Sequence, residues 1–161
     1  MASFATSYIP TVASQVTRAA DSASMIGNNF ARWYNVNEGT VYLSGAYSVQ
    51  NGVTNANIGI SGAGIFAFVS RDARFVVAST TVGFNFLGAA DATYAFNLAG
   101  AYKNNNSATT LNGATPTVDT TAVPTVGTSF IITPNKNGGT IKRIAYYPRR
   151  LANTELSSIT S

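Results

Sequence analysis

The sequence predicts an all-β fold in which two antiparallel sheets pack as a jelly-roll sandwich, with one short helix at the C-terminus. About ten to twelve short segments rich in β-branched and aromatic residues are separated by turn signals, a spacing typical of sandwiches and jelly rolls. The length of 161 residues suits one domain. Only 10% of the residues are charged, so the polar surface must consist of Asn, Thr, Ser and Gly, as suits an all-β protein at high salt or outside cells.

The N-terminal part is interpreted as a lead-in segment, residues 1–12, followed by a single sandwich domain, residues 13–161. Pro10 favours an extended backbone in the residue before it. Val12–Ala19 is predicted as the first strand, lying near the last one, as in sandwiches that bring their ends together. Residues 22–38 are predicted to be irregular.

The middle of the chain is predicted as strands that follow one another through tight turns. Asn104–Asn106 and Asn112–Gly113 tolerate the left-handed backbone of hairpin turns. Residues 114–127 have no periodicity and are interpreted as a long surface connection. The predicted strands, chosen for β-branched and aromatic content, are Gly39–Tyr47, Asn57–Ile60, Ile65–Val69, Arg74–Ala78, Val82–Phe86, Ala92–Tyr102 and Ser129–Thr133.

The C-terminal segment, residues 138–159, is predicted as a strand, a sharp stop and a short helix. A three-residue step between the apolar Ile141 and Ile144 breaks the period of two, which predicts a β-bulge near Lys142 and Arg143. Pro148 has no amide hydrogen and must end the strand. The helix that follows is expected to bury a short apolar stripe and to be capped by Asn153; the stripe consists of Leu151, Leu156 and Ile159.

Three stretches carry a family resemblance. The first is Val-Thr-Arg-Ala-Ala-Asp at 16–21, and the second, at 100–113, is Ala-Tyr-Lys with a polar turn and a strand ending in Asn-Gly. The third, at 138–156, is a glycine and an apolar strand followed by Tyr-Tyr-Pro-Arg-Arg-Leu and a later Glu-Leu. They resemble the concanavalin-A-like, or laminin-G-like, jelly-roll domains of phage tail fibres, tailspikes and head fibres. The family usually has Ser where Ala152 stands, so the helix cap should be weaker by ~1 kcal/mol. The resemblance implies a location on the virion surface, contacts with other virion proteins, and a homo-oligomer, usually a trimer.

Charge and residue usage exclude several functions. The net charge of +4 comes from scattered basic residues with one cluster, Lys142, Arg143, Arg149 and Arg150, so we expect no nucleic-acid partner. No apolar run is long enough to span a bilayer, and we expect no membrane insertion. The sequence has no Cys and no His, which excludes thiolate and imidazole nucleophiles and metal ligands.

Carboxylate chemistry is restricted as well. No predicted strand carries two acids at the alternate positions that jelly-roll glucanases use, although Glu38 and Asp91 could meet in space. We therefore expect no catalytic residue, no cofactor and no metal site, with a structural calcium as the weaker alternative. The six carboxylates are Asp21, Glu38, Asp72, Asp91, Asp119 and Glu155.

The remaining possibility is binding by shape, with aromatic rings and amides holding a neutral sugar. The candidate carbohydrate-binding residues are Trp33, Tyr34, Tyr47, Tyr102, Asn104 and Asn105. Each also has a structural interpretation: Trp33 and Tyr34 as a core plug with Phe30, Tyr102 as a strand end, and the asparagines as a turn.

We therefore predict a non-catalytic fibre-type domain on the virion surface that recognises host-cell glycans. One alternative is a capsid-decorating head fibre or assembly module with protein partners only, which a large exposed apolar face would favour. A second is a glycan-depolymerising spike domain, which a close pair of carboxylates would favour.

Overall fold

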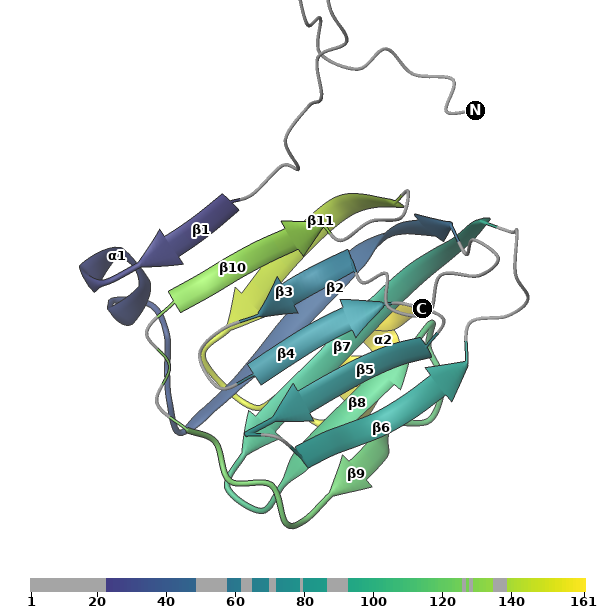
Figure 1. The fold of residues 1–161 in the computed structure, drawn as a ribbon. Coiled ribbons are helices and arrows are strands. Elements are labelled where there is room, and N and C mark those ends of the chain that lie inside the picture. The colour runs from purple at the N-terminus through teal and green to yellow at the C-terminus, as the bar shows by residue number, and fades with distance from the viewer. Residues whose placement is uncertain are drawn as a thin grey trace, which may run out of the picture.

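The computed structural model describes residues 23–48, 58–61, 65–69, 72–78, 80–86, 93–125, 127, 129–134 and 139–161. These residues form two antiparallel sheets that face each other, with one helix on the outside (Figure 1). The six-stranded sheet has the order β1 (Ala23–Ile26), β10 (Ser129–Pro134), β3 (Ile58–Ser61), β4 (Ile65–Val69), β5 (Asp72–Val77) and β6 (Thr80–Phe86). The five-stranded sheet has the order β11 (Gly139–Tyr147), β2 (Glu38–Ser48), β7 (Thr93–Lys103), β8 (Ser107–Leu111) and β9 (Thr117–Asp119). The predicted all-β antiparallel sandwich is confirmed.

The main core lies between the two sheets. Alternate residues of β2, β5 and β7 point inward, as the period of two requires. Phe75 on β5 is fully buried, and its ring packs against the backbone of Gly100 on β7, where a side chain would have no room. Among the described residues, other large side chains of this core include Val41, Leu43, Val77, Val82, Phe96 and Leu98.

A second, smaller core lies on the outer face of the five-stranded sheet, under helix α2 (Asn153–Thr160). Leu151 and Leu156 are 2% and 0% exposed and pack against small side chains of the sheet, and Ile159 joins them. Those small side chains, which let the helix approach closely, are Ala99, Ala101 and Ala108. Figure 1 shows α2 on the side of this sheet that faces away from the six-stranded sheet. The predicted apolar stripe of the helix is confirmed.

Strand β11 behaves as its sequence predicts. Its pairing with β2 skips one residue between Ile141 and Arg143, so a bulge lies at Lys142, and the strand ends at Tyr147 before Pro148. The predicted hairpin turns are confirmed too. Asn105, Asn112 and Gly113 have φ angles of 53°, 49° and 72°, which is left-handed backbone.

Three local predictions are wrong. Residues 22–38 are not wholly irregular, because they contain β1, which pairs with β10, and the one-turn helix α1 (Asn28–Ala31). The connection over residues 114–127 contains β9, which pairs with β8. Asn153 does not cap α2, because the N-cap is Ala152 and the Asn153 Oδ1 instead accepts a hydrogen bond from Arg150 Nη2 (2.7 Å).

The predicted lead-in, residues 1–12, and the predicted first strand, Val12–Ala19, lie outside the described residues, so the described part of the sandwich begins at residue 23. In the part of the chain that the structure describes, no helix combines the length and apolar character that crossing a bilayer would require.

Candidate functional site

An aromatic cluster fills one end of the sandwich and includes three of the predicted sugar-binding residues, Trp33, Tyr34 and Tyr102. The rings of Trp33 and Tyr146 meet edge to face at 4.8 Å, and those of Tyr34 and Tyr102 stack at 6.1 Å. The described members of this aromatic cluster are Phe30, Trp33, Tyr34, Tyr102, Phe130 and Tyr146. The structure therefore brings these residues together, around a core plug.

Tyr102 is a core residue within this cluster. Its side chain is fully buried, and its hydroxyl donates to the carbonyl oxygen of Asn35 at 2.7 Å. The Tyr146 hydroxyl lies 2.9 Å away and accepts a hydrogen bond from the backbone N–H of Asn35 at 2.8 Å. Burial, followed by the hydrogen bonds with its neighbours, raises the pKa of Tyr102 far above its usual range. A ring without exposed surface gives a sugar nothing to stack on.

Trp33 and Tyr34 are half-buried and keep some exposed ring surface. The indole of Trp33 donates a hydrogen bond to the Met25 sulfur at 2.8 Å, so both its ring and its N–H are engaged by the protein. Burial raises the pKa of Tyr34. These two residues offer at most the rim of a binding surface.

The other predicted residues do not share one site. Asn104 and Asn105 are exposed in the β7–β8 turn, where the Asn105 amide donates to the Ala122 carbonyl at 3.0 Å. Tyr47 is near one end of β2, whereas Glu38, at the other end, pairs with Lys103 beside that turn. Nine residues of extended strand separate the two ends by roughly 30 Å.

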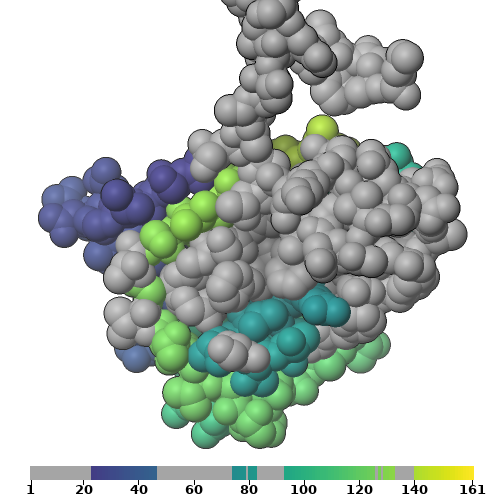
Figure 2. Space-filling view, in the orientation of Figure 1, coloured from purple at the N-terminus to yellow at the C-terminus, as the bar shows by residue number. Residues whose placement is uncertain are grey.

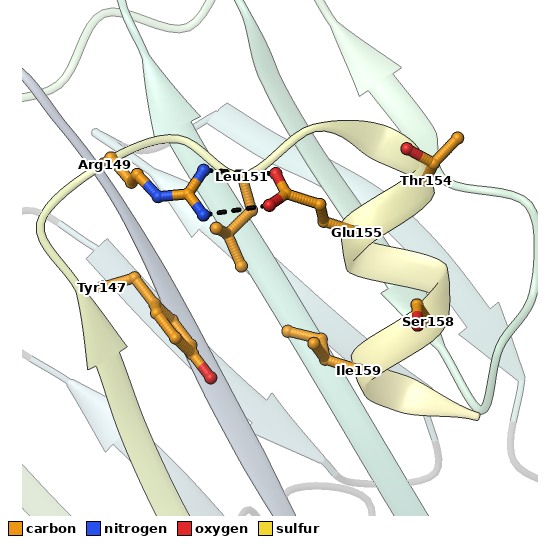
Figure 3. A pocket seen from close by; sticks show the side chains of 7 residues that line it. All are labelled: Tyr147, Arg149, Leu151, Thr154, Glu155, Ser158 and Ile159. Carbon is orange, nitrogen blue, oxygen red and sulfur yellow. Dashed lines mark hydrogen bonds and ion pairs between the residues drawn. The ribbon is translucent and has the colours of Figure 1, made fainter.

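The described residues form a different pocket, between β11 and α2 on the outer face of the five-stranded sheet. We call it the α2 pocket; it has a volume of about 380 Å³ and is lined by Tyr147, Arg149, Leu151, Thr154, Glu155, Ser158 and Ile159. Figure 3 shows Tyr147 on the strand and Ile159 on the helix pointing toward each other, with Glu155 reaching toward Arg149. Tyr147 faces outward because its neighbour Tyr146 faces the core. None of these residues was a predicted ligand.

Thr40 fixes the loop between β11 and α2. Its buried hydroxyl donates to the Arg149 carbonyl at 2.9 Å and accepts from the Leu151 amide at 3.0 Å. The neighbouring Arg150 points away from the pocket and donates to the carbonyl oxygens of Leu151 (2.7 Å) and Asn106 (3.4 Å). Burial lowers the pKa of Arg150. These hydrogen bonds therefore fix the backbone of residues 149–151, which carries two side chains of the pocket lining.

Arg149 and Glu155 form the polar wall of the α2 pocket. The Arg149 Nη1 and Nη2 atoms donate to the two Glu155 carboxylate oxygens at 3.2 and 2.9 Å (Figure 3). The Ala152 amide donates to Glu155 Oε2 at 2.7 Å, which closes the first turn of the helix. The hydrogen bonds from Arg149, with that from Ala152, hold the pKa of the Glu155 carboxyl below its usual range, and the same pair raises the pKa of Arg149.

Chemically, the α2 pocket combines an aromatic ring, apolar side chains, hydroxyls and one ion pair. Such groups can stack against a sugar ring and hydrogen-bond to its hydroxyls. The lining holds a single carboxylate, Glu155, whereas glycoside hydrolysis of the usual kind requires two. Elsewhere, within the described ranges, no three Asp or Glu side chains gather into a group that could hold a metal ion. Asp91, which could have met Glu38, lies outside those ranges.

Sequence reasoning missed the α2 pocket, although five of its lining residues lie in a stretch that carried the family resemblance: Tyr147, Arg149, Leu151, Thr154 and Glu155. The available signal was the outward position of Tyr147, which follows from the alternation of β11, next to a helix that places Thr154 and Ser158 one turn apart. That signal predicts neighbours on a surface but not a hollow between them.

No family model and no curated protein matches this chain. Several solved structures share its fold. The receptor-binding domain of botulinum neurotoxin mosaic serotype C/D matches with a TM-score of 0.63 at 11% identity, over 87% of this chain and 39% of that one. The binding domain of botulinum neurotoxin serotype D matches with a TM-score of 0.57 at 10% identity, over 89% of this chain and 40% of that one.

The sialidase of Trypanosoma rangeli, solved in complex with sialic acid, matches with a TM-score of 0.53 at 13% identity, over 74% of this chain and 22% of that one. This chain thus spans about two fifths of the neurotoxin domains and about a fifth of the sialidase. These similarities confirm the concanavalin-A-like jelly-roll fold.

Proposed function

We propose that this chain is a non-catalytic glycan-binding domain, displayed on a phage virion as part of a fibre-type protein. The α2 pocket is the observation that carries the binding role. At about 380 Å³ it falls in the range of ~300–1,000 Å³ usual for small-molecule sites, and it would hold one or two sugar rings. The Tyr147 ring would stack against the apolar face of a pyranose, while Thr154 and Ser158 would bind its hydroxyls.

The virion assignment rests on the sequence resemblance to phage fibre domains. The stretch at 100–113 includes the end of β7 and all of β8, and the stretch at 138–156 includes β11 and the start of α2. The second stretch supplies most of the residues that line the α2 pocket. The sialidase neighbour, which was solved with sialic acid bound, supports glycans only as the broad class of ligand. In this proposal the host-cell glycan is the partner outside the particle, and other virion proteins are the partners within it.

The non-catalytic part of the proposal rests on the chemistry of the residues. The chain has no His and no Cys, and the α2 pocket has one carboxylate that is already held by Arg149. A general acid and a separate base or nucleophile would need a second carboxylate within reach.

An array of immobilised oligosaccharides tests the binding role, with wild type and two variants of one residue. Tyr147→Ala removes the stacking ring and should abolish binding, whereas Tyr147→Phe keeps the ring and should bind within about threefold of wild type, because stacking is the contact that the proposal assigns to Tyr147. Asn104→Ala, on the β7–β8 turn, is the matched surface control and should bind as wild type. Wild type that binds no glycan would overturn the proposal.

The same array separates the two candidate locations. Trp33→Phe alters the aromatic cluster and leaves the α2 pocket untouched, so it should not affect binding. If Trp33→Phe loses binding while Tyr147→Ala keeps it, the site is the aromatic cluster and the assignment to the α2 pocket is wrong.

One observation favours the alternative of an assembly module. The exposed side chains of Met25 (40%) and Ile26 (66%) lie on β1, the end strand of the six-stranded sheet. Figure 2 shows β1 and α1, in purple, projecting at the edge of the molecule. An edge strand with apolar side chains favours association, which for a fibre would be a homotrimer. Light scattering on wild type and Ile26→Lys, read beside the glycan array, tests this. The alternative requires a wild-type oligomer that the lysine dissociates and that binds no glycan on the array.

A further inference from the structure

We infer that the α2 pocket selects a neutral pyranose and rejects sugars that carry a carboxylate. This inference rests on the proposed function and adds the chemical class of the ligand. It follows from how Arg149 is used in the structure, since arginine is the side chain best suited to bind a sugar carboxylate through two parallel hydrogen bonds.

In this structure a carboxylate of the protein already occupies those two donors of Arg149. Arg149 presents its Nη1 and Nη2 to the two oxygens of Glu155, at 3.2 and 2.9 Å, so the paired face of the guanidinium points at a carboxylate of the protein itself. The Ala152 amide holds the same carboxylate from the other side at 2.7 Å. A carboxylate on a ligand would have to displace Glu155 or lie beside it, and like charges placed together are repelled.

The charged residues beside the pocket do not offer a ligand carboxylate another partner. Arg149 and Glu155 are the only charged residues of the lining, so its formal charge is zero. Arg150 is turned away and bonded to Asn106, Leu151 and Asn153. On the same face of the sheet, the Arg143 guanidinium lies over the Tyr42 ring at 5.7 Å and does not line the pocket.

A neutral sugar matches the groups that remain free. Arg149 and Glu155 are 59% and 42% exposed, so guanidinium N–H groups outside the pair and carboxylate lone pairs remain within reach of a ligand. Thr154 and Ser158 add hydroxyls, each of which donates and accepts. Sugar hydroxyls also donate and accept, so adjacent hydroxyls of a pyranose can satisfy this mixed wall without a net charge.

The test uses matched ligands that differ only in a carboxylate. Glucosides are compared with glucuronides and galactosides with galacturonides on the array, together with sialylated glycans, for the full chain. We expect wild type to bind at least one neutral member and to bind its acidic counterpart about tenfold more weakly or worse. The variant Glu155→Gln keeps an oxygen to accept from the Ala152 amide but frees the charge of Arg149, and should raise binding of the acidic member about tenfold.

The possible failures can be told apart. Wild type that binds no sugar overturns both the proposed function and this inference. Wild type that binds acidic sugars as well as their neutral counterparts leaves glycan binding standing and overturns the selectivity. Glu155→Gln that folds like wild type, judged by its circular dichroism and melting temperature, but gains no acidic ligand shows that Glu155 is not the cause. If Glu155→Gln fails to fold, the wild-type comparison alone decides the selectivity.

Discussion

The hydroxyls of Tyr102 and Tyr146 lie 2.9 Å apart at the closed end of the sandwich, and each also bonds to the backbone of Asn35. Tyr102 donates its only hydroxyl hydrogen to the Asn35 carbonyl. The hydrogen bond between the two hydroxyls must therefore be donated by Tyr146. The pair therefore fixes the loop between α1 and β2 to two strands of the five-stranded sheet.

Tyr102→Phe should lower the free energy of unfolding by about 1–2 kcal/mol, because it removes the 2.7 Å hydrogen bond to the part-buried Asn35 carbonyl. That oxygen then keeps only the longer hydrogen bond from the Tyr146 hydroxyl (3.4 Å). Urea unfolding followed by circular dichroism measures this change in the free energy of unfolding. Tyr147→Phe, which removes a tyrosine hydroxyl from the outer face, is the control and should change stability by less than about 0.5 kcal/mol. Equal effects of the two changes would show that the network contributes nothing.

Alkaline pH should destabilise the protein through the same residue. Burial raises the pKa of Tyr102, so the folded chain keeps this proton at a pH where the unfolded chain loses it, near the usual value of about 10. The protonated Tyr102 hydroxyl makes its full contribution to the free energy of unfolding below about pH 10. Above about pH 10 this contribution declines, by up to about 1.4 kcal/mol per pH unit. Unfolding titrations between about pH 8 and about pH 11 should show this decline, and Tyr102→Phe should make it shallower. An unchanged slope would contradict the assignment to Tyr102.

Gly100→Ala should destabilise the fold by about 1–3 kcal/mol, since a Cβ at this position would overlap the buried ring of Phe75. The double variant with Phe75→Leu makes room, and should lose less stability than the sum of the two single changes. Thermal melts of wild type, the two single variants and the double variant provide this double-mutant cycle. Strict additivity would mean that the two sheets do not meet at this contact.

Ala152→Ser should stabilise the protein by about 0.5–1 kcal/mol. Ala152 is the N-cap of α2, with an extended backbone (φ −60°, ψ 155°), and no side chain caps the helix. Glu155 already provides the reciprocal half of a capping box through the Ala152 amide, so a serine hydroxyl would complete it. Ala152→Val lacks the oxygen and should not stabilise. A serine variant that melts at or below the wild-type temperature would contradict the prediction.

The elements that the sequence predicted well are those decided by local chemistry. Pro148 cannot continue a ladder, Asn112 and Gly113 accept left-handed backbone, and the step from Ile141 to Ile144 forces a bulge wherever the strand pairs. These features hold irrespective of the partner strand, so one sequence suffices to place them.

The errors concern features that depend on packing. Four exposed residues form β1 because β10 lies beside them, and three form β9 because β8 does, so neither strand has a pattern of its own. Helix α2 begins one residue earlier than the side chain of Asn153 suggests, because the buried Thr40 hydroxyl holds the preceding backbone in place. The α2 pocket exists only where that helix meets β11, and sequence alone does not show this meeting.

Trp33, the single tryptophan of the chain, gives the protein a built-in optical reporter. Its indole touches rings from both sheets, Phe130 on β10 and Tyr146 on β11, so its emission depends on the two layers being closed together at this end. The α2 pocket opens on the outer face of one layer, beyond Tyr146. Fluorescence therefore follows the opening of the sandwich, while a sugar that occupies the pocket should leave the emission spectrum nearly unchanged.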